Sequence, residues 1–183
     1  MPEQRAQRRL AAILSADVVG YSRLMGEDEE GTLARLKAHR SELIDVKIAE
    51  HRGRVVKSTG DGILIEFASV VDAVRCAVEM QSGMDTRNSD IPQDRRIDLR
   101  VGINLGDIIV DDNDIHGDGV NIAARLEGLA QPGGICMSQT VLDHAWGKVP
   151  FEVDDAGEQA LKNIERPIHV YRVIPPGVYE KIV

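Results

Sequence analysis

Aromatic residues and cysteines are scarce in this sequence of 183 residues. Aromatics make up only 3% of the chain, so a buried core has to be built mostly from Val, Ile, Leu and Ala. The two cysteines, Cys76 and Cys136, lie in separate apolar segments, and neither has a metal-type spacing to a second ligand. This argues against a disulfide framework and a cysteine-based zinc site, and it indicates two buried, reduced thiols.

An excess of basic charge and a long apolar run are also missing. The net charge of −8 argues against a nucleic-acid-binding surface, but it permits one nucleotide because a metal ion can bring the compensating charge. No stretch approaches the roughly 18 apolar residues of a membrane span. The short apolar run after Arg8 and Arg9 lacks the length and the cleavage pattern of a secretory signal. We therefore expect a cytoplasmic protein without a membrane span of its own.

What is present is the composition of an ordinary globular protein, with 43% hydrophobic and 28% charged residues. The length suits one domain. No repeat, low-complexity tract or linker divides the chain. We expect an N-terminal tail over residues 1–9, one domain over 10–174 and a C-terminal tail over 175–183.

The order of apolar patterns predicts an α+β fold with a ferredoxin-like βαββαβ core, followed by additional C-terminal strands and a helix. Strands are expected over residues 10–19, 54–58, 63–67, 97–104, 107–110, 135–137, 151–153 and 168–174. Helices are expected over residues 26–53, over 69–84 and from 117 or 119 to 129, with a shorter one over 139–144 that Ser138 can cap. Residues 83–95 are expected to form a loop.

Two acidic residues stand out because of their positions. Asp17 interrupts the apolar first strand, where a carboxylate is costly unless it is paired or bound to a metal. Asp61 lies in the tight turn at Thr59–Gly62, whose glycines leave room beside the carboxylate. Each alone has an ordinary explanation, as a strand-ending or a hairpin aspartate. Together, at the ends of strands that we expect to be neighbours, they predict a site for Mg²⁺ or Mn²⁺ that serves a nucleoside triphosphate.

A second polar pair follows in the segment Gly117–Glu127. Asn121 and Arg125 are four residues apart and therefore share one face of the predicted helix. A lone arginine on a helix is usually a solvated or salt-bridged surface residue. An asparagine one turn earlier makes a directed polar pair, and the arginine can neutralise charge that develops on a phosphoryl group.

Four segments, in this order along the chain, resemble the catalytic domain of the class III nucleotidyl cyclases, in particular that of bacterial adenylate cyclases. The resemblance extends over residues 9–173. The segments that carry it are Ser15–Ser22, Val56–Gly62, Arg100–Gly106 and Asp114–Arg125.

The resemblance implies roles for both polar pairs. Asp17 and Asp61 correspond to the metal-binding aspartates, with two Mg²⁺ or Mn²⁺ ions per site. Asn121 corresponds to the residue that orients the ribose, and Arg125 to the residue that contacts the reacting phosphate.

The resemblance also implies substrate contacts. Lys57 and Asp114 match the pair that recognises adenine, and Lys162 falls where the family often has a lysine for the terminal phosphates. Asn163 and Asp107 depart from the family pattern, which usually has a glycine at the first position and in some members an arginine near the second. Phosphate contacts can therefore differ in detail.

The adenine assignment agrees with hydrogen-bonding chemistry. Adenine presents an acceptor at N1 and a donor amino group at C6, whereas Lys57 offers only donors and an ionised Asp114 only acceptors. Guanine reverses this pattern and would leave buried polar groups unpaired, a mismatch that discriminates by roughly 10⁴ or more. We therefore favour ATP as the substrate.

The implied reaction is an attack of the ribose 3′-hydroxyl of ATP on its α-phosphorus, which gives 3′,5′-cyclic AMP and pyrophosphate. In the family, the metal aspartates and the other site residues come from two protomers. The full set in one chain therefore implies a homodimer with shared active sites. A sensor or regulatory domain is expected outside this chain. The alternative is a catalytically silent, nucleotide-binding regulatory domain of the same fold.

Other nucleotide- and metal-binding classes fit less well. A diguanylate cyclase would need a Gly-Gly-Asp/Glu-Glu-Phe-like turn, which Thr59–Gly62 is not. A calcium-binding EF-hand would need ligands where His116 and Ala123 stand. The chain has no P-loop pattern, and its five histidines show no zinc spacing.

Overall fold

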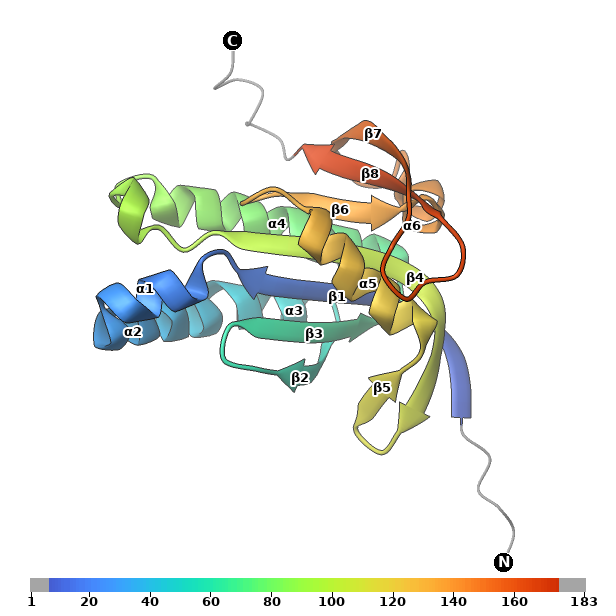
Figure 1. Ribbon diagram of the computed structural model, residues 1–183, viewed down its shortest axis with the longest axis horizontal. Coiled ribbons are helices and arrows are strands. Elements are labelled where there is room, and N and C mark those ends of the chain that lie inside the picture. The colour runs from blue at the N-terminus through green and yellow to red at the C-terminus, as the bar shows by residue number, and fades with distance from the viewer. Residues whose placement is uncertain (1–6, 175–183) are drawn as a thin grey trace, which may run out of the picture.

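The computed structural model describes residues 7–174. At its centre lies an eight-stranded sheet (Figure 1). Seven strands follow the order β2-β3-β1-β4-β6-β8-β7, and β5 pairs with β4 outside this path. The strands are β1 (Gln7–Val18), β2 (Arg54–Ser58), β3 (Gly62–Phe67), β4 (Leu99–Asp111), β5 (Asp114–His116), β6 (Ile135–Ser138), β7 (Glu152–Gln159) and β8 (Ile168–Ile174). The α-helices are α1 (Tyr21–Glu27), α2 (Glu29–His39), α3 (Asp45–Glu50), α4 (Val70–Asn88), α5 (Asp118–Leu129) and α6 (Gln139–Ala145).

The first part of the chain forms the predicted ferredoxin-like core. β1 to β4 lie in the order β2-β3-β1-β4, and each neighbouring pair is antiparallel. The helices α1 to α3 connect β1 to β2, and α4 connects β3 to β4, which completes the βαββαβ unit. Beyond it, β6 joins β4 in parallel, and β8 and β7 extend the sheet as antiparallel strands. The α+β fold class, with additional C-terminal strands and a helix, is confirmed.

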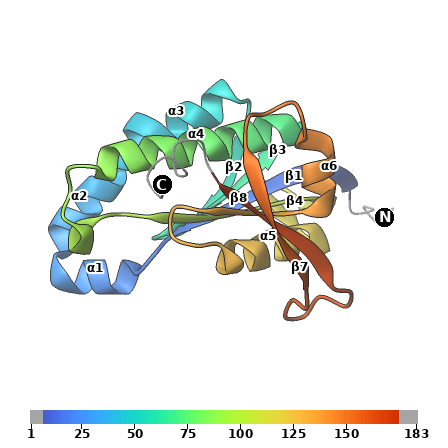
Figure 2. The same ribbon diagram turned by 90° about the horizontal axis from the view of Figure 1, so that it is seen from above.

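Helices cover the two faces of the sheet unequally (Figure 2). α2, α3 and α4 lie over one face, above the largest hydrophobic cluster, which buries Ile65, Phe67 and Met80. α5 lies over the other face, against β1 and β4. β1 is therefore covered on both sides, and Ala11–Ala16 is buried throughout. This two-sided burial explains why the strand shows an apolar run in place of an alternating pattern.

The helix predicted over residues 26–53 is confirmed over most of its length, but it begins later than predicted. α2, a π-helical turn at Arg40–Ile44 and α3 follow one another without interruption from Glu29 to Glu50. The break lies at Asp28, which leaves the helical conformation (φ −156°, ψ 88°) and accepts a hydrogen bond from the Gly31 N–H at 3.0 Å. The acidic run opens α2 as expected, but Asp28 is the N-cap of that helix, and α1 precedes it from Tyr21.

Two other boundaries differ from the sequence prediction. α4 continues into the predicted loop over residues 83–95, and Asn88 at its end donates from Nδ2 to the Ile97 carbonyl at 3.0 Å. β4 is one continuous strand where two were predicted. Gly106 does not interrupt it, because the position of a Cβ there lies 3.0 Å from the Cα of Gly119, and α5 fills the space.

Ser138 precedes α6, but its side chain does not cap the helix as predicted. Its hydroxyl donates to Asn104 Oδ1 at 2.7 Å. Asn104 is buried in β4, and an unpaired amide there would cost free energy. The hydroxyl therefore satisfies a buried side chain of the sheet and does not cap the N-terminus of α6.

The predicted tails are only partly covered by the described residues. β1 begins at Gln7, inside the tail predicted over residues 1–9. The tail predicted over 175–183 lies outside the described range. Between residues 7 and 174, every helix is too short or too polar to cross a membrane.

α5 packs very close to the sheet at Gly102 of β4. A Cβ at this position would lie 2.2 Å from the Glu127 backbone nitrogen and 2.4 Å from the Ala123 carbonyl oxygen. Both atoms belong to the backbone of α5, which cannot move without shifting the helix. Gly102 therefore sets the depth at which α5 sits on the sheet.

We expect Gly102→Ala to lower the free energy of unfolding by about 1–3 kcal/mol, because the added methyl group pushes α5 off β4. Urea unfolding measures this loss. Gly128→Ala is the matched control, since a Cβ at this exposed position of α5 meets no atom within 4 Å. The control should be neutral or more stable by up to about 1 kcal/mol through helix propensity. Equal losses in the two variants would contradict the packing argument.

Candidate active site

Asp17 and Asp61 meet at one shallow hollow at the end of β1. Asp17 lies opposite Gly62 of β3 and opposite Arg100 of β4 in the sheet register. The Val18 N–H donates to the Asp61 carbonyl at 3.1 Å, which fixes the β2–β3 turn beside the strand. Both aspartates line a hollow of about 260 Å³. The strands that lead to them are neighbours, as predicted, and the role of the two aspartates as metal ligands stays a prediction.

Arg100 holds the Asp17 carboxylate with two hydrogen bonds. Its Nε donates to Oδ1 at 3.2 Å and its Nη2 to Oδ2 at 3.0 Å. The two side chains are 32% and 22% exposed, so the pair is partly shielded from water. Hydrogen bonding to Asp17 raises the pKa of Arg100 further above its ordinary value. This two-point contact offsets the cost of placing a carboxylate at the end of a buried strand.

Glu127 of α5 adds a third carboxylate to the hollow. The Ser15 hydroxyl donates to Glu127 Oε1 at 3.3 Å. Burial raises the pKa of Glu127 from 4.5 to about 7, and the negative charge of Asp17 is the second-largest cause of this shift. The hollow therefore concentrates negative charge, which is opposed by Arg100 and by Lys57 in its lining.

No local sequence pattern singles out Arg100 or Glu127. Arg100 opposes Asp17 only because β1 and β4 are paired in one particular register. Glu127 reaches the hollow only because Gly102 lets α5 approach. Both residues stand inside or next to segments that carried the resemblance, which is the one signal that could have drawn attention to them.

The donor set of the hollow fits a small divalent cation. Asp17 and Asp61 offer carboxylate oxygens, which Mg²⁺ and Mn²⁺ prefer over nitrogen or sulfur ligands. The hollow is open to solvent on one side, since the Asp17 side chain keeps 22% of its exposure. Water and phosphate oxygens can therefore complete the coordination of a bound ion.

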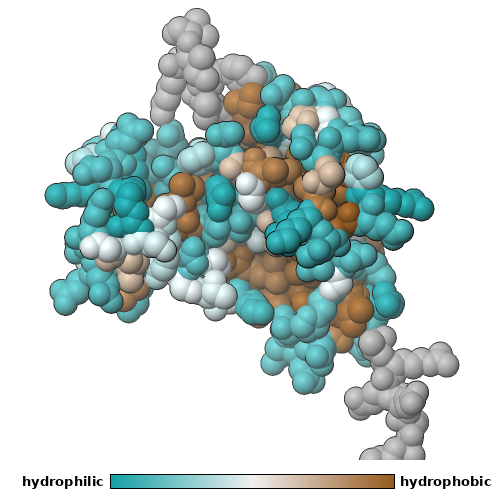
Figure 3. Space-filling view, viewed as in Figure 1, coloured by the Kyte–Doolittle hydropathy of each residue, from teal (hydrophilic) through white to brown (hydrophobic). Residues whose placement is uncertain are grey.

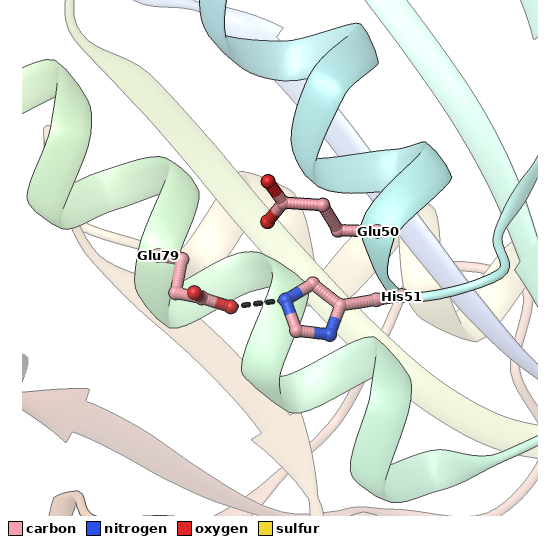
Figure 4. Close-up of side chains that lie close together, drawn as sticks. All are labelled: Glu50, His51 and Glu79. Carbon is pink, nitrogen blue, oxygen red and sulfur yellow. Dashed lines mark hydrogen bonds and ion pairs between the residues drawn. The ribbon is translucent and has the colours of Figure 1, made fainter.

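A different acidic group lies between α3 and α4. Glu50, His51 and Glu79 are the residues between 7 and 174 that bring three possible metal-ligand atoms within 4.8 Å of one another (Figure 4). Lys47 Nζ already lies 3.1 Å from Glu50 Oε2 and 3.5 Å from Glu79 Oε1, and His51 Nε2 is hydrogen bonded to Glu79. This group is an ion-pair network that ties the end of α3 to α4.

Lys57 and Asp114 lie on neighbouring elements. Lys57 is exposed on β2 and lines the same hollow as the aspartates. β5, which carries Asp114, is in contact with β2. Asp114 is partly exposed and accepts a hydrogen bond from the Ile115 N–H at 2.8 Å through Oδ1. Its second oxygen lies 3.7 Å from His116 Nε2.

Asn121, Arg125 and Lys162 do not reach the hollow within one chain. Asn121 and Arg125 share an exposed face of α5, and in the described part of the chain neither side chain has a hydrogen-bond or ion-pair partner. Lys162 is exposed in the turn between β7 and β8. Asn163 beside it has a φ of 64°, a conformation that asparagine tolerates better than most residues and that glycine adopts freely. Asparagine can therefore keep the turn that the family usually builds with glycine.

Asp107, the second departure from the family pattern, lies at the far end of the β1–β4 pair. Its carboxylate forms an ion pair of 3.1 Å with Arg8, and both side chains are more than half exposed. It does not line the hollow.

Comparison with known proteins identifies the family of this chain. Residues 4–174 match the family described as the adenylate and guanylate cyclase catalytic domain. A protein of Rhizobium meliloti (strain 1021), named "Putative adenylate cyclase 3", is 50% identical over 175 residues. This match covers 96% of the chain but only 30% of that relative, so the chain corresponds to a minor part of the longer protein.

Solved structures share the fold. The crystal structure of an adenylate/guanylate cyclase/hydrolase from Silicibacter pomeroyi has a TM-score of 0.88 and 49% identity, and the match covers 93% of this chain and 99% of that one. The adenylyl cyclase CyaB from P. aeruginosa has a TM-score of 0.80 at 24% identity, over 93% of this chain and 96% of that one. At 24% identity the second likeness concerns the fold alone.

We expect Glu127 to make the stability of the protein depend on pH. Because its pKa is raised in the folded chain, the folded state binds a proton more tightly than the unfolded state between about pH 4.5 and pH 7. The free energy of unfolding therefore falls as the pH rises through this window. Glu127→Gln removes the loss, so its stability relative to wild type should rise by about 1–2 kcal/mol from pH 5 to pH 8, with allowance for solvent screening.

Urea unfolding at a series of pH values measures this difference. The control is Glu165→Gln, which changes an exposed carboxylate in the turn before β8. The control should follow the wild-type profile. A stability difference between Glu127→Gln and wild type that stays constant with pH would contradict the assignment.

Proposed function

Because the chain belongs to the adenylate and guanylate cyclase catalytic-domain family, we propose that it is an adenylate cyclase, which converts ATP to 3′,5′-cyclic AMP and pyrophosphate. The observation that carries the proposal is the convergence of Asp17 and Asp61 on one hollow in a chain that also presents Asn121 and Arg125 to solvent. A 50% identical relative whose name includes adenylate cyclase supports ATP over GTP.

In the proposed reaction, the residues bind and orient the triphosphate. Asp17 and Asp61 hold Mg²⁺ or Mn²⁺, two ions per site, which when bound lower the pKa of the 3′-hydroxyl and stabilise the leaving pyrophosphate. Asn121 orients the ribose, and Arg125 neutralises charge on the α-phosphate as the P–O bond forms. Lys162 contacts the terminal phosphates. Catalysis then consists mainly of positioning and charge stabilisation.

Lys57 and Asp114 read the base in this proposal. The ammonium group of Lys57 donates to adenine N1, and Asp114 accepts from the C6 amino group. Asp114 Oδ1 already accepts from its own strand, so Oδ2 is the oxygen left for the base. ATP is supplied inside the cell, and we place the activity in the cytoplasm.

We further propose that two copies of the chain share each active site. Asn121 and Arg125 do not line the metal hollow of their own chain, so a second chain has to bring its hollow to them. The face that carries α5 also has apolar side chains that are only partly covered, which Figure 3 shows as brown areas among polar ones. Among these are Val56, Leu64, Val110, Val120 and Ile122. A two-fold axis through this face would cover the apolar side chains and build two complete sites.

We expect mixed variants to restore activity. Asp61→Ala and Arg125→Ala should each reduce cyclic AMP formation with Mn²⁺ by at least about 100-fold, because each removes a charge that acts on the transition state. An equal mixture should recover about a quarter of the wild-type rate, since half of the dimers are mixed and each has one intact site. The specific activity of the wild type should also rise with protein concentration.

A matched control shows whether the recovered activity comes from sites shared between two chains or only from the higher total protein concentration. A mixture of Asp17→Ala with Asp61→Ala should stay inactive, because both lesions fall in the same half of the site. A dead Asp61→Ala and Arg125→Ala mixture would contradict the shared site. No cyclic nucleotide from wild type at high concentration would favour a silent regulatory domain.

We expect Lys57→Gln combined with Asp114→Asn to lower the preference for ATP over GTP, as the ratio of kcat/KM values, by at least about tenfold. Side-chain amides can present a donor or an acceptor, so they no longer oppose guanine. The asparagine side chain in Asp114→Asn keeps an Oδ1 for the Ile115 N–H, which preserves the local turn. Asp112→Asn in the same turn is the control and should leave the ratio unchanged. An unchanged ratio in the double variant would contradict the base assignment.

A further inference from the structure

A cavity of about 420 Å³ lies between the C-terminal half of α4 and the strands that extend the sheet beyond β4. Among the described residues, none lines both this cavity and the hollow of Asp17 and Asp61. Its volume is in the range of small-ligand pockets, roughly 300–1,000 Å³. We propose that this cavity binds a small ligand that carries a cationic hydrogen-bond donor, an amine or an amidine, on an apolar body.

The wall formed by α4, β6 and β8 suits the apolar body. Met84, Ile135 and Val173 line the cavity and belong to the main hydrophobic cluster. Pro132 and Ile174 continue this apolar lining. A ring or an alkyl group in the cavity would leave water and pack against these side chains, which favours such a ligand over a bare ion.

Gln81 supplies an acceptor that lacks a donor. The residue lines the cavity and is only 3% exposed. Its Nε2 donates to the carbonyls of Leu99 and Gly134, each at 2.9 Å, so the orientation of the amide is fixed. Within residues 7–174, its Oε1 has no hydrogen-bond partner. A buried acceptor without a donor costs free energy, and an N–H group of a ligand can remove this cost.

Two carboxylates give the cavity its preference for a cation. Asp85 and Asp98 both line it. Burial raises the pKa of Asp98, Arg96 outside the lining opposes this shift, and Asp85 adds to it. Asp98 Oδ1 accepts from Asn88 Nδ2 at 3.3 Å, which leaves Oδ2 for a ligand. Two like charges that influence each other in this way favour a positive group between them.

Arg172 does not cancel this preference. It is the basic residue that the described part of the lining contains. In the sheet register it lies opposite Asp154 of β7, a third acidic residue of the lining. Opposite charges in this arrangement offset each other across the strand pair. Asp85 and Asp98 therefore remain as an excess of negative charge, and we expect the cavity to reject anions.

The cavity is connected to the end of β1 through the backbone. The Asp98 carbonyl accepts from the Val19 N–H at 2.9 Å. The Leu99 carbonyl, which Gln81 also contacts, accepts from the Gly133 N–H at 2.8 Å. A ligand that binds Gln81 and Asp98 therefore acts on groups that hold both the exit of β1 and the turn before β6. The amides of Val19 and Gly133 should report its presence.

The test compares benzamidine, benzamide and benzoate, which place a cationic, a neutral and an anionic head on the same ring. ¹H–¹⁵N NMR of the chain without nucleotide or metal follows the amides of Val19, Gly133 and Gly134. Benzamidine should shift them saturably with a Kd of about 1 mM or lower, an ordinary affinity for a ligand of this size. Benzamide should bind at least about fivefold more weakly, and benzoate should give no saturable shift.

Two results with these ligands would overturn the proposal. The first is benzoate binding as tightly as benzamidine. The second is the absence of a saturable shift with benzamidine up to about 20 mM. Because neither nucleotide nor metal is present, this readout does not depend on the proposed cyclase activity.

Variants of the lining locate the ligand. Asp98→Asn keeps the size of the side chain and should weaken benzamidine binding by about fivefold or more, but benzamide binding by no more than about twofold. An equal loss for both ligands would contradict the charge preference. Ser82→Phe places a ring at the exposed rim of the cavity and should abolish binding of both ligands, with a wild-type unfolding curve.

Thr86→Phe is the matched control for Ser82→Phe. Thr86 is also exposed on α4, one turn later, and it does not line the cavity. This variant should bind benzamidine as the wild type does. Shifts of the same size in Ser82→Phe and wild type would place the ligand elsewhere and refute the site, as would an equal loss in the Ser82 and Thr86 variants.

Discussion

The placement of the Asp17 carboxylate at the end of β1, whose residues Ala11–Ala16 are buried throughout, is the constraint on which the site depends. β1 is covered by α4 and its neighbours on one face and by α5 on the other, so a charge at its end is costly without a partner. The sheet supplies that partner from the adjacent strand, as Arg100. It also brings the Asp61 turn beside the same strand end through a backbone hydrogen bond. The concentration of charge at this point follows from the strand register, from the β2–β3 turn held by that bond and from the packing of α5 on β4.

The two faces of the sheet differ in how fully they are packed and in where the candidate site residues lie. The face under α2, α3 and α4 carries the main hydrophobic cluster, and ion pairs such as Lys47 with Glu79 join its helices. The other face has one helix, smaller apolar clusters and most of the candidate site residues. A rigid, well-packed layer thus supports a second layer whose uncovered apolar and polar groups are available to a partner chain.

Local patterns predicted much of this architecture. The structure has the strand, the turn and the helix close to where the sequence predicted them: the apolar run of β1, the hairpin turn at Thr59–Gly62 and helix α5. The break at Asp28 was missed because the helical pattern on its two sides is similar, and only the capping contact with Gly31 distinguishes them. The continuity of β4 was missed because Gly106 looks like a breaker until α5 is packed beside it.

The candidate site likewise contains residues whose positions the sequence predicted and residues whose positions it did not. That Asp17 and Asp61 meet could be predicted, since each ends an element that had to lie near the other. Arg100 and Glu127 could not, because their proximity depends on a register and on a helix–sheet distance that no local pattern encodes. The roles of Asn121, Arg125, Lys57, Asp114 and Lys162 stay predictions, because one chain does not contain the contacts that would define them.

Helix α5 carries Glu127 on its inner side and Asn121 and Arg125 on its outer side, and Gly102 fixes its depth. Because α5 is a single helix, the depth that Gly102 sets fixes both of these sides at once. A change at Gly102 would therefore alter the metal hollow and the exposed polar pair together.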